Sequence, residues 1–244
     1  MTPHGGERDA EIVGALGAVR ARIARACQDA GRDPQSVTLV AVTKTRPASD
    51  VAVLARLGVH DVGESKDQEA RAKIAELGDL GVDPAALRWH VVGQLQSNKA
   101  RSVVSYAHAV HSLDRPKLVR ALADAVDAAG GRDEPLHVFV QVSLDGDPQR
   151  GGVPQAGLAE LVDAVAARPQ LRLRGLMAVP PRGEDPQRAF ARLAELAAGV
   201  RADHPRADAL SAGMSDDLDA AVRHGATHVR VGSALLGRRD PVFG

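Results

Sequence analysis

The sequence contains few aromatic residues and has no excess of charge of either sign. Aromatic side chains make up 2% of its 244 residues, and 31 lysines and arginines balance 31 aspartates and glutamates. Nucleic-acid binding usually needs a positive surface and aromatic platforms for base stacking, and attraction to an anionic membrane needs the same positive excess. We therefore expect neither a nucleic acid nor a membrane as partner, and the partner should be a small molecule.

Cysteine is nearly absent, and long apolar runs are missing. The one cysteine, Cys27, cannot form an internal disulfide, which fits a reducing compartment. It continues a helical pattern of apolar residues at spacings of three and four, so we interpret it as a core residue. No apolar stretch approaches the roughly 20 residues that span a bilayer, and Met1–Arg8 lacks the basic-then-apolar layout of a secretory signal. We expect a cytoplasmic protein with a disordered tail over residues 1–7.

Short apolar runs alternate with helical patterns along the whole chain. After an opening helix over roughly residues 7–30, eight runs have the length and composition of buried strands. The predicted strands are Thr38–Lys44, Asp61–Gly63, Arg88–Val92, Ala109–Ser112, Leu136–Val142, Leu173–Ala178, Ala209–Ser211 and His228–Val231. Eight strand–helix units in a chain of this length close more naturally into a barrel than into an open sheet. We predict one α/β domain over residues 8–244, a (β/α)8 TIM-type barrel with an extra N-terminal helix.

Lys44 stands at the end of the first predicted strand, directly before a turn. Barrels of this type build their sites from the loops that follow the strands, so the amine should lie at that rim. A lysine in a partly dry pocket can act as a nucleophile and form Schiff bases with aldehydes. An exposed lysine without a function is the ordinary alternative at a strand end, so the other loops of the rim decide between the two.

The loops after the seventh and eighth predicted strands are rich in glycine and hydroxyl side chains. They are Ser211–Asp217 and Arg230–Gly237, and barrels commonly bind phosphate at these two places through backbone N–H groups. Asp216 and Asp217 suit a helix start but would repel a phosphate, so we expect them to point outward. An amine opposite an anion site matches what pyridoxal phosphate requires. A Schiff-base aldolase or a phosphosugar enzyme would use the same layout.

Two further features are not expected. Among the nine histidines, no two stand four residues apart within one predicted helix, so a metal site is not indicated. His90 and His228 lie within predicted strands, where structural histidines are more common. No coiled coil or broad apolar strip indicates an oligomer, so we expect a monomer.

Several segments resemble the pyridoxal phosphate homeostasis proteins, in that family's order and spacing. These segments are Val42–Pro47, Gly63–Ser65, Trp89–Lys99, Gly175–Ala178, Leu210–Asp217 and Val229–Ser233. The resemblance implies a single pyridoxal phosphate-binding barrel, similar to the N-terminal domain of alanine racemases but without their second, β-rich domain.

The resemblance also implies roles for individual residues. Lys44 would form the Schiff base with the cofactor, and Arg230 would face the pyridine nitrogen. Further cofactor contacts would be Ser65, His90, Met177, Ser211, Gly213, Met214, Ser215, Gly232 and Ser233, with those from Ser211 onward holding the phosphate. Ser65 replaces an asparagine that is usual in the family, and we expect this difference to tune affinity rather than to abolish binding.

Arg230 bears on the choice between an enzyme and a carrier. Arginine stays charged at any working pH, so a pyridine nitrogen beside it does not readily carry a proton and the ring is a weak electron sink. Racemases with the same arginine use a lysine and a tyrosine as opposed bases, whereas the one tyrosine here, Tyr106, is predicted at the far face. We therefore expect a protein that holds pyridoxal phosphate, takes part in its intracellular homeostasis and supplies recipient apoenzymes. A low-efficiency amino-acid racemase is the alternative, and a docking surface with a vestigial cofactor site is a third possibility.

Overall fold

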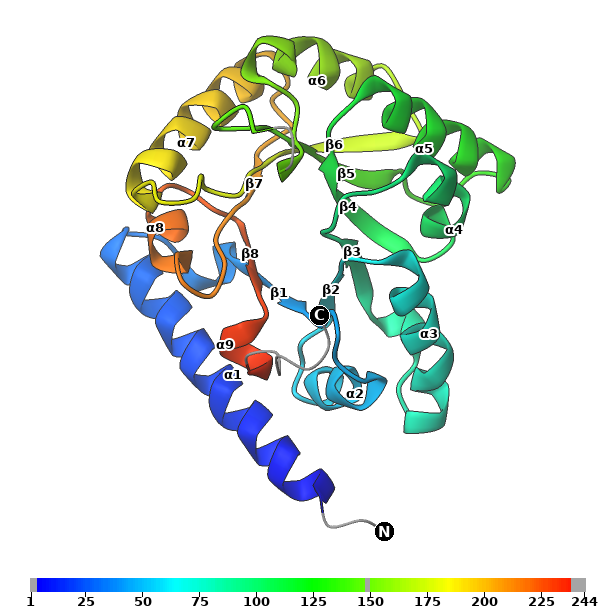
Figure 1. Ribbon diagram of the computed structural model, residues 1–244, viewed down its shortest axis with the longest axis vertical. Helices are drawn as coiled ribbons and strands as arrows, with labels where there is room; N and C mark the ends of the chain where they lie inside the picture. Colours follow the sequence, from blue (N-terminus) through cyan, green and yellow to red (C-terminus); the bar gives the residue numbers. More distant parts are fainter. Residues whose placement is uncertain (1–3, 148–149, 238–244) are drawn as a thin grey trace.

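Eight parallel strands form a closed barrel with helices around it (Figure 1). The computed structural model describes residues 4–147 and 150–237. The strands are β1 Thr38–Val42, β2 Asp61–Glu64, β3 Arg88–Val91, β4 Ala107–Leu113, β5 Leu136–Gln141, β6 Leu171–Met177, β7 Ala209–Ser211 and β8 His228–Val231. Ala41 of β1 is paired with Val62 of β2 on one side and with Val231 of β8 on the other, which closes the barrel. The predicted eight-stranded barrel is confirmed.

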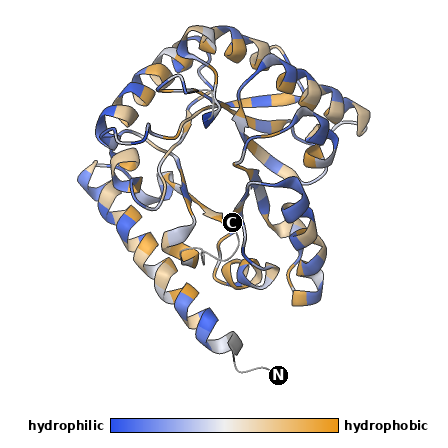
Figure 2. Cartoon of the chain, viewed as in Figure 1, coloured by the Kyte–Doolittle hydropathy of each residue, from blue (hydrophilic) through white to orange (hydrophobic). Residues whose placement is uncertain are grey.

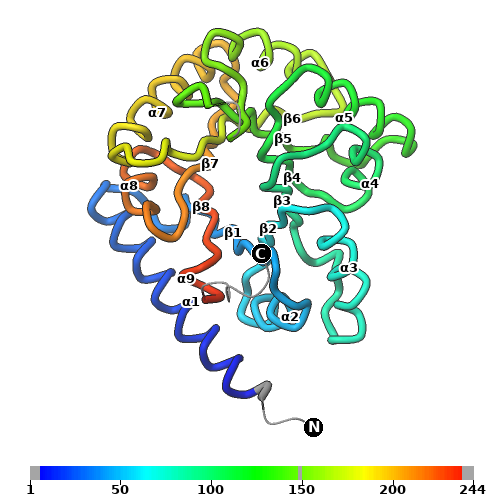
Figure 3. The backbone as a smooth tube through the Cα atoms, viewed as in Figure 1, coloured from blue at the N-terminus to red at the C-terminus, as the bar shows by residue number. Residues whose placement is uncertain are grey.

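The helices follow the strands in chain order and form a ring, as the tube in Figure 3 shows. They are α1 His4–Asp29, α2 Ala48–Arg56, α3 Asp67–Leu77, α4 Ala100–Val104, α5 Pro116–Ala128, α6 Leu158–Ala166, α7 Pro186–Asp203, α8 Leu218–Arg223 and α9 Ser233–Leu236. Hydrophilic and hydrophobic segments alternate along the helices in Figure 2, as expected for helices with one buried and one solvated face. None of the helices in the described ranges is long and apolar enough to cross a membrane.

All eight predicted strands are present, and their ends agree with the prediction to within two residues. The first differs most clearly at the functional end, because β1 stops at Val42 rather than at Lys44. Thr45 has a φ of 64°, so the chain turns sharply there and cannot continue an extended strand. Lys44 therefore lies in the turn that follows the strand.

The N-terminal helix α1 is longer than predicted and packs on the outside of the ring, against α2, α8 and α9. It begins at His4, so residues 4–7 of the expected disordered tail belong to this helix, and residues 1–3 lie outside the described part of the chain. Cys27 is fully buried on its inner face, as predicted. The Nε–H of Arg22 on α1 is shared between the two carboxylate oxygens of Asp219 on α8, with Nε 3.0 and 2.8 Å from them.

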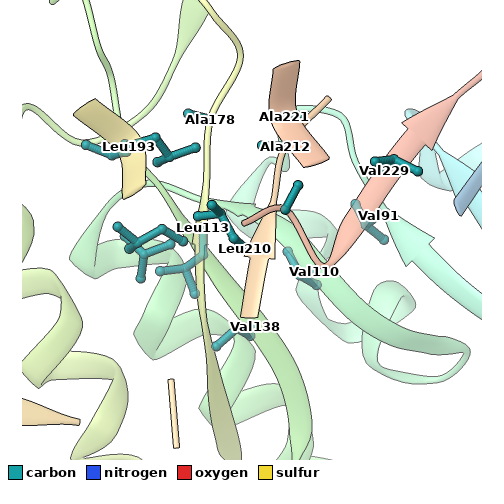
Figure 4. Packing of buried hydrophobic residues seen from close by; sticks show 14 of the residues in the cluster. Val91, Val110, Leu113, Val138, Ala178, Leu193, Leu210, Ala212, Ala221 and Val229 are labelled. Atoms are coloured by element: carbon teal, nitrogen blue, oxygen red, sulfur yellow. The ribbon is translucent and has the colours of Figure 1, made fainter. Parts of the chain in front are cut away.

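Two apolar layers hold the barrel together. Figure 4 shows part of the outer one, a cluster that includes Val110, Leu210 and Val229 of the strands together with Leu193 of α7 and Ala221 of α8. Burying a side chain of this size stabilises the fold by roughly 1.5–3 kcal/mol. The inner layer is a small cluster within the barrel, made of Ala109, Phe139, Met177 and Ala209. The polar groups that share the interior with this inner cluster connect the two ends of the barrel.

Candidate functional site

A cavity of about 520 Å³ opens at the C-terminal ends of the strands, a size typical of small-molecule sites. Its walls come from the turns and loops that follow β1, β2, β3, β6, β7 and β8. The lining residues are Val42, Lys44, Thr45, Arg46, Ser65, Val92, Gly93, Val179, Met214, Ser215, Asp216, Arg230, Gly232, Ser233, Leu236 and Gly237. Most of the predicted site residues therefore lie at the C-terminal ends of the strands, where the site was predicted.

Lys44 lies on the wall of this cavity with an exposed side chain. Within the described ranges its ammonium forms no hydrogen bond and no ion pair, which distinguishes it from the lysine behind it, Lys73. An amine without a protein partner can react with a ligand aldehyde without first breaking a salt link. The geometry thus fits the role predicted for Lys44.

A buried ion network supports the turn that carries Lys44. Lys73 of α3 is 4% exposed and donates from Nζ to Glu64 Oε1 at 2.5 Å, to Thr43 O at 2.6 Å and to Glu69 Oε1 at 3.0 Å. Glu69 in turn accepts a hydrogen bond from the backbone N–H of Thr45, the residue with positive φ. Burial raises the pKa of Glu64, although Lys73 and Thr43 both stabilise its charged form. The network fixes the backbone on both sides of Lys44 and explains how Thr45 tolerates a left-handed conformation.

Arg230 forms the floor of the cavity and is 6% exposed. Its Nη1 donates to Ser211 Oγ at 2.7 Å and its Nη2 donates to the carbonyl of Ala178 at 3.1 Å. Burial lowers the pKa of Arg230 to about 10, so the guanidinium remains charged at neutral pH. Asp217, the one group that favours its charge, does not neutralise it by direct contact.

Beneath Arg230 a chain of hydrogen bonds runs through the barrel interior. Ser211 Oγ lies 2.7 Å from His111 Nδ1, and His111 Nε2 lies 2.8 Å from His90 Nδ1. The Nε2 of His90 lies 2.9 Å from Asp61 Oδ1, at the other end of the barrel. These hydrogen bonds could not be predicted from the sequence, because the side of β4 on which His111 lies depends on register shifts in that strand.

The polarity of this chain follows from its two ends. Bonds from Arg88 and His90 hold the pKa of Asp61 below its usual range despite burial, so Asp61 is a carboxylate and can only accept. Burial keeps the pKa of His111 well below its usual range, so its ring is neutral. In the arrangement in which the rings of His90 and His111 are both neutral, His90 donates to Asp61, His111 donates to His90, and Ser211 donates to His111. Arg230 donates to Ser211, and every member of the chain is satisfied in one set of tautomers.

The loop after β7 is arranged around its own hydrogen bonds. Met214 N donates to Asp217 Oδ1 at 2.6 Å, so Asp217 turns back onto the loop and does not point outward as predicted. Burial raises the pKa of Asp217. Asp216 is exposed, as predicted, but it lies at the edge of the cavity.

Ser215 connects the two loops that were predicted to hold phosphate. Its Oγ accepts a hydrogen bond from Ala234 N at 3.1 Å, so its own O–H remains able to donate to an anion. No side chain caps α9, which begins at Ser233, and the early N–H groups of a helix lack partners within the helix. Ser215, Gly232 and Ser233 all line the cavity.

Seven of the predicted site residues line the cavity and four do not. The seven are Lys44, Ser65, Met214, Ser215, Arg230, Gly232 and Ser233. The other four lie beneath or behind the wall: His90 and Ser211 belong to the interior chain, and Met177 belongs to the apolar cluster. Gly213 is packed so tightly, with a φ of 93°, that an added Cβ would lie 2.7 Å from the Cβ of Ala221.

Sequence reasoning missed Gly93 and Arg46 as wall residues. An added Cβ at Gly93 would lie 2.4 Å from the carbonyl oxygen of Ser65, so only glycine permits this approach of the loops after β2 and β3. Arg46 donates to the carbonyl of Gly237 at 2.6 Å and thereby joins the turn after β1 to the end of α9. Tyr106 lies in the turn before β4 and does not line the cavity, in agreement with its predicted position at the far face.

Comparisons with known proteins agree with this architecture. Residues 15–240 match the family model of the alanine racemase N-terminal domain. The pyridoxal phosphate homeostasis protein of Mycobacterium leprae is 48% identical over 95% of this chain and 94% of its own length. The protein of the same name from Escherichia coli K12 is 40% identical over 94% of this chain and 97% of its own.

Solved structures show the same relationship. PipY of Synechococcus elongatus, solved with pyridoxal phosphate bound, superposes with a TM-score of 0.80 at 35% identity, over 93% of this chain and all of PipY. The alanine racemase of Corynebacterium glutamicum, at 18% identity and a TM-score of 0.65, shares the fold over 94% of this chain and 63% of the racemase. The chain therefore belongs to the alanine racemase N-terminal domain family and, within it, to the pyridoxal phosphate homeostasis proteins.

Proposed function

We propose that this protein binds pyridoxal 5'-phosphate at the C-terminal mouth of the barrel, through a Schiff base to Lys44, and takes part in the homeostasis of that cofactor. The observation that carries the proposal is the unpaired amine of Lys44 in a cavity whose lining also includes Ser215, Gly232 and Ser233. The bound cofactor would supply an aldehyde for the amine and an anionic phosphate. A PipY structure with the cofactor bound supports the same assignment.

The roles of the other wall residues follow from their hydrogen bonds. Ser215 can donate its hydroxyl proton to a phosphate while it still accepts from Ala234. Arg230 is held by Ser211 and Ala178, so it presents a fixed positive charge at the floor, where the family resemblance places the pyridine nitrogen. Asp216 at the rim opposes a second negative group and restricts where an anion can lie. Four residues do not line the cavity and are proposed to act only by supporting residues that do: His90, Met177, Ser211 and Gly213.

A carrier is the form of this function that the wall residues favour. Within the described ranges the lining contains no tyrosine and no histidine, so the tyrosine that racemases pair with a lysine has no counterpart in this cavity. The charge of Arg230 also opposes protonation of a pyridine nitrogen beside it, which weakens carbanion stabilisation. We therefore assign the protein to holding the cofactor and passing it to recipient apoenzymes, as a cytoplasmic monomer, with a low-efficiency amino-acid racemase as the competing assignment.

Borohydride reduction followed by peptide mass mapping tests the attachment. The cofactor mass is expected on the peptide that contains Lys44 and is expected to be absent in Lys44→Ala. Lys66→Ala is the matched control, since Lys66 is an exposed lysine next to Ser65 but outside the cavity lining. An adduct that remains on another lysine in Lys44→Ala would contradict the proposal.

Exchange of the α-proton of L-alanine in deuterated water separates a carrier from a racemase. The cofactor-loaded protein is expected to incorporate deuterium no faster than free pyridoxal phosphate under the same conditions. Incorporation at enzyme-like rates that disappears in Lys44→Ala would establish the racemase instead. Sedimentation of the loaded protein checks the monomer.

A further inference from the structure

A second cavity, of about 260 Å³, lies at the opposite end of the barrel. Thr38, Asp61, Arg88 and His228, which line it, are the first residues of β1, β2, β3 and β8. The cavity therefore opens at the N-terminal mouth, away from Lys44. Nothing in the proposed function uses this cavity.

Positive and neutral donors dominate its wall, and the one carboxylate of the lining is already engaged. Asp61 accepts from Arg88 Nε at 2.7 Å and from Arg88 Nη2 at 2.6 Å, and its Oδ1 also lies 2.9 Å from His90 Nε2. This bidentate pair neutralises Arg88. Arg88 and His90 thus take up three of the roughly four acceptor positions of this carboxylate, and Arg88 already supplies its counter-charge.

Arg174 of β6, unlike Asp61 and Arg88, has no charged partner in this wall. Its Nε is buried without a hydrogen-bond partner, and its guanidinium forms no hydrogen bond or ion pair within residues 4–147 and 150–237. Buried polar atoms of this kind nearly always have a partner in native proteins, so a guanidinium that lines a cavity and has no partner indicates a missing acceptor. A guanidinium binds carboxylate, phosphate or sulfate oxygens in preference to other acceptors.

Three imidazoles complete the wall. His108 and His137 lie edge to face with ring centroids 4.6 Å apart, and neither forms a hydrogen bond with the described residues. His228 is bonded only through Nδ1, which lies 2.8 Å from Thr227 Oγ1. A neutral imidazole still donates one N–H, so these rings can contribute hydrogen bonds to an acceptor in the cavity. Arg88 and Arg174 oppose a metal ion there, and the described residues contain no group of three metal ligands.

We propose that the N-terminal mouth of the barrel binds a small oxyanion of the phosphate type, held by Arg174 together with the N–H groups of His108 and His137. The cavity has room for inorganic phosphate or for the phosphate end of a small ester. The bound oxygen atoms accept from the guanidinium of Arg174, which has no acceptor among the described residues. This site does not depend on the proposed cofactor site, because the cavity at the C-terminal mouth and the cavity at the N-terminal mouth share no lining residue.

Binding is coupled to protonation of the histidines. Burial first, and repulsion from neighbouring positive groups second, lower the pKa of His108 to about 4, of His137 to about 4 and of His228 to about 3. The charged and titratable groups around the three rings are Asp61 on β2, Arg88 and His90 on β3, Arg132 before β5, and Arg172 and Arg174 on β6. Since positive groups outnumber Asp61, an anion supplies the missing counter-charge and raises these pKa values. Affinity for the anion should therefore increase as the pH falls.

Histidine-selective NMR of the full chain provides the test, with inorganic phosphate as the probe. Phosphate is expected to shift the imidazole signals of His108 and His137 saturably, in the millimolar range or below. The signals are assigned with His108→Gln and His137→Gln. Arg174→Gln is expected to weaken binding by about tenfold or more, because the bidentate donor is lost. Arg172→Gln removes the same charge from an exposed position on the same strand, outside this cavity, and is expected to weaken binding much less than Arg174→Gln, because Arg172 acts only through its charge. The absence of a saturable shift, or equal weakening by both variants, would overturn the proposal.

Sulfate gives a second measurement that needs no variant. It remains a dianion between pH 5 and 8, so any pH dependence of its affinity comes from the protein. Affinity is expected to rise as the pH falls, by up to roughly tenfold per pH unit for each proton taken up. Sulfate affinity that does not change over this range would contradict the coupling to His108 and His137. Glycerol phosphate in parallel with inorganic phosphate identifies the source of the anion: tighter binding of the ester points to a small organic phosphate, and tighter binding of phosphate points to the free ion.

Discussion

The C-terminal and N-terminal mouths of the barrel hold their positive groups in different ways. At the C-terminal mouth Lys44 lies in an exposed turn, and the rigidity comes from Lys73, Glu64 and Glu69 behind it. At the N-terminal mouth Arg174 belongs to a strand and faces the cavity directly. A group on a loop can move to meet a reacting aldehyde, whereas a group on a strand offers a fixed position. This difference suits the roles that we propose, covalent chemistry at the first mouth and simple ion binding at the second.

Lys44→Ala should produce the largest difference between the two mouths. Covalent retention of pyridoxal phosphate is expected to disappear, because no other lysine within the described ranges lines the cavity at the C-terminal mouth. The yellow absorbance after dialysis measures this loss. Phosphate titration at His108 and His137 should be unchanged, and a parallel loss at both mouths would mean that the two cavities are not independent.

Lys73→Met removes the support beneath the turn and should have the next largest effect. It leaves the buried carboxylate of Glu64 without its counter-charge, and breaking one partner of a buried pair typically destabilises a protein by about 3–5 kcal/mol. Urea unfolding measures the change, and Lys66→Met, at an exposed position, should stay within about 0.5 kcal/mol of the parent. The double variant Glu64→Gln, Lys73→Met should recover part of the loss. Equal stability of Lys73→Met and the parent would exclude a supporting role for the network.

Ser211→Ala and Ser215→Ala form a matched pair that separates support from contact. Ser211→Ala removes the acceptor of Arg230 and the donor to His111 in the buried chain, which should reduce the free energy of unfolding by about 1–3 kcal/mol. Ser215→Ala, at the cavity wall, should leave stability within about 0.5 kcal/mol and weaken cofactor retention instead. Thermal unfolding and equilibrium dialysis together distinguish the two. The reverse assignment of effects would place the phosphate at Ser211.

The histidines of the N-terminal mouth should make stability depend on pH over a defined window. In the folded protein burial lowers the pKa of His108 and His137 to about 4, whereas in the unfolded chain both titrate near 6.5. Between these values the unfolded chain binds more protons, so stability falls as the pH decreases from about 6.5 to about 4. The lowered pKa of Asp61 acts only below about 3.9 and does not overlap with this window.

Urea midpoints across this range measure the dependence on the histidines. The fall should be smaller in His108→Gln, His137→Gln, and saturating sulfate should also reduce it. An unchanged slope in the double variant would show that other groups control the acid sensitivity.

Ser65→Asn should have the smallest effect, because it restores an amide that is usual in the family at a wall position. A single added hydrogen bond contributes about 0.5–1.5 kcal/mol, so cofactor affinity should change by no more than about tenfold. Equilibrium dialysis of the two proteins measures the ratio. Complete loss of binding in Ser65→Asn would mean that the site has no room for the larger side chain.

The barrel and the residues at its C-terminal mouth could both be predicted from the order of strands in the sequence. In a parallel barrel every loop after a strand reaches one face, so Lys44, Ser215, Arg230 and Ser233 could be placed together from strand order alone. The direction of a side chain within a strand was harder to predict. The register shifts where β4 pairs with β3 and with β5, so alternation along the strand does not reveal which face carries His111. Ser211 was expected at the phosphate, but it points into the interior and supports Arg230.

The N-terminal mouth could not be predicted because its groups come from strand starts that are far apart in the sequence. His108, His137 and Arg174 have no spacing that suggests a common site, and each one alone looks like an ordinary residue of a strand. Only closure of the barrel brings them to one cavity. The N-terminal tail shows the opposite limit, since residues 4–7 extend α1 although two glycines there disfavour a helix.

The single polarity of the interior bonds has an electrical consequence for the whole barrel. To carry a proton from the floor beneath Arg230 to Asp61, the hydroxyl and both imidazoles would have to reverse their hydrogen bonds, and His111, which is fully buried, would have to carry the added charge. The column at the barrel axis therefore behaves as an insulator rather than a wire. Protonation events at one end stay at that end, so each mouth can respond to its own ligand while the other remains undisturbed.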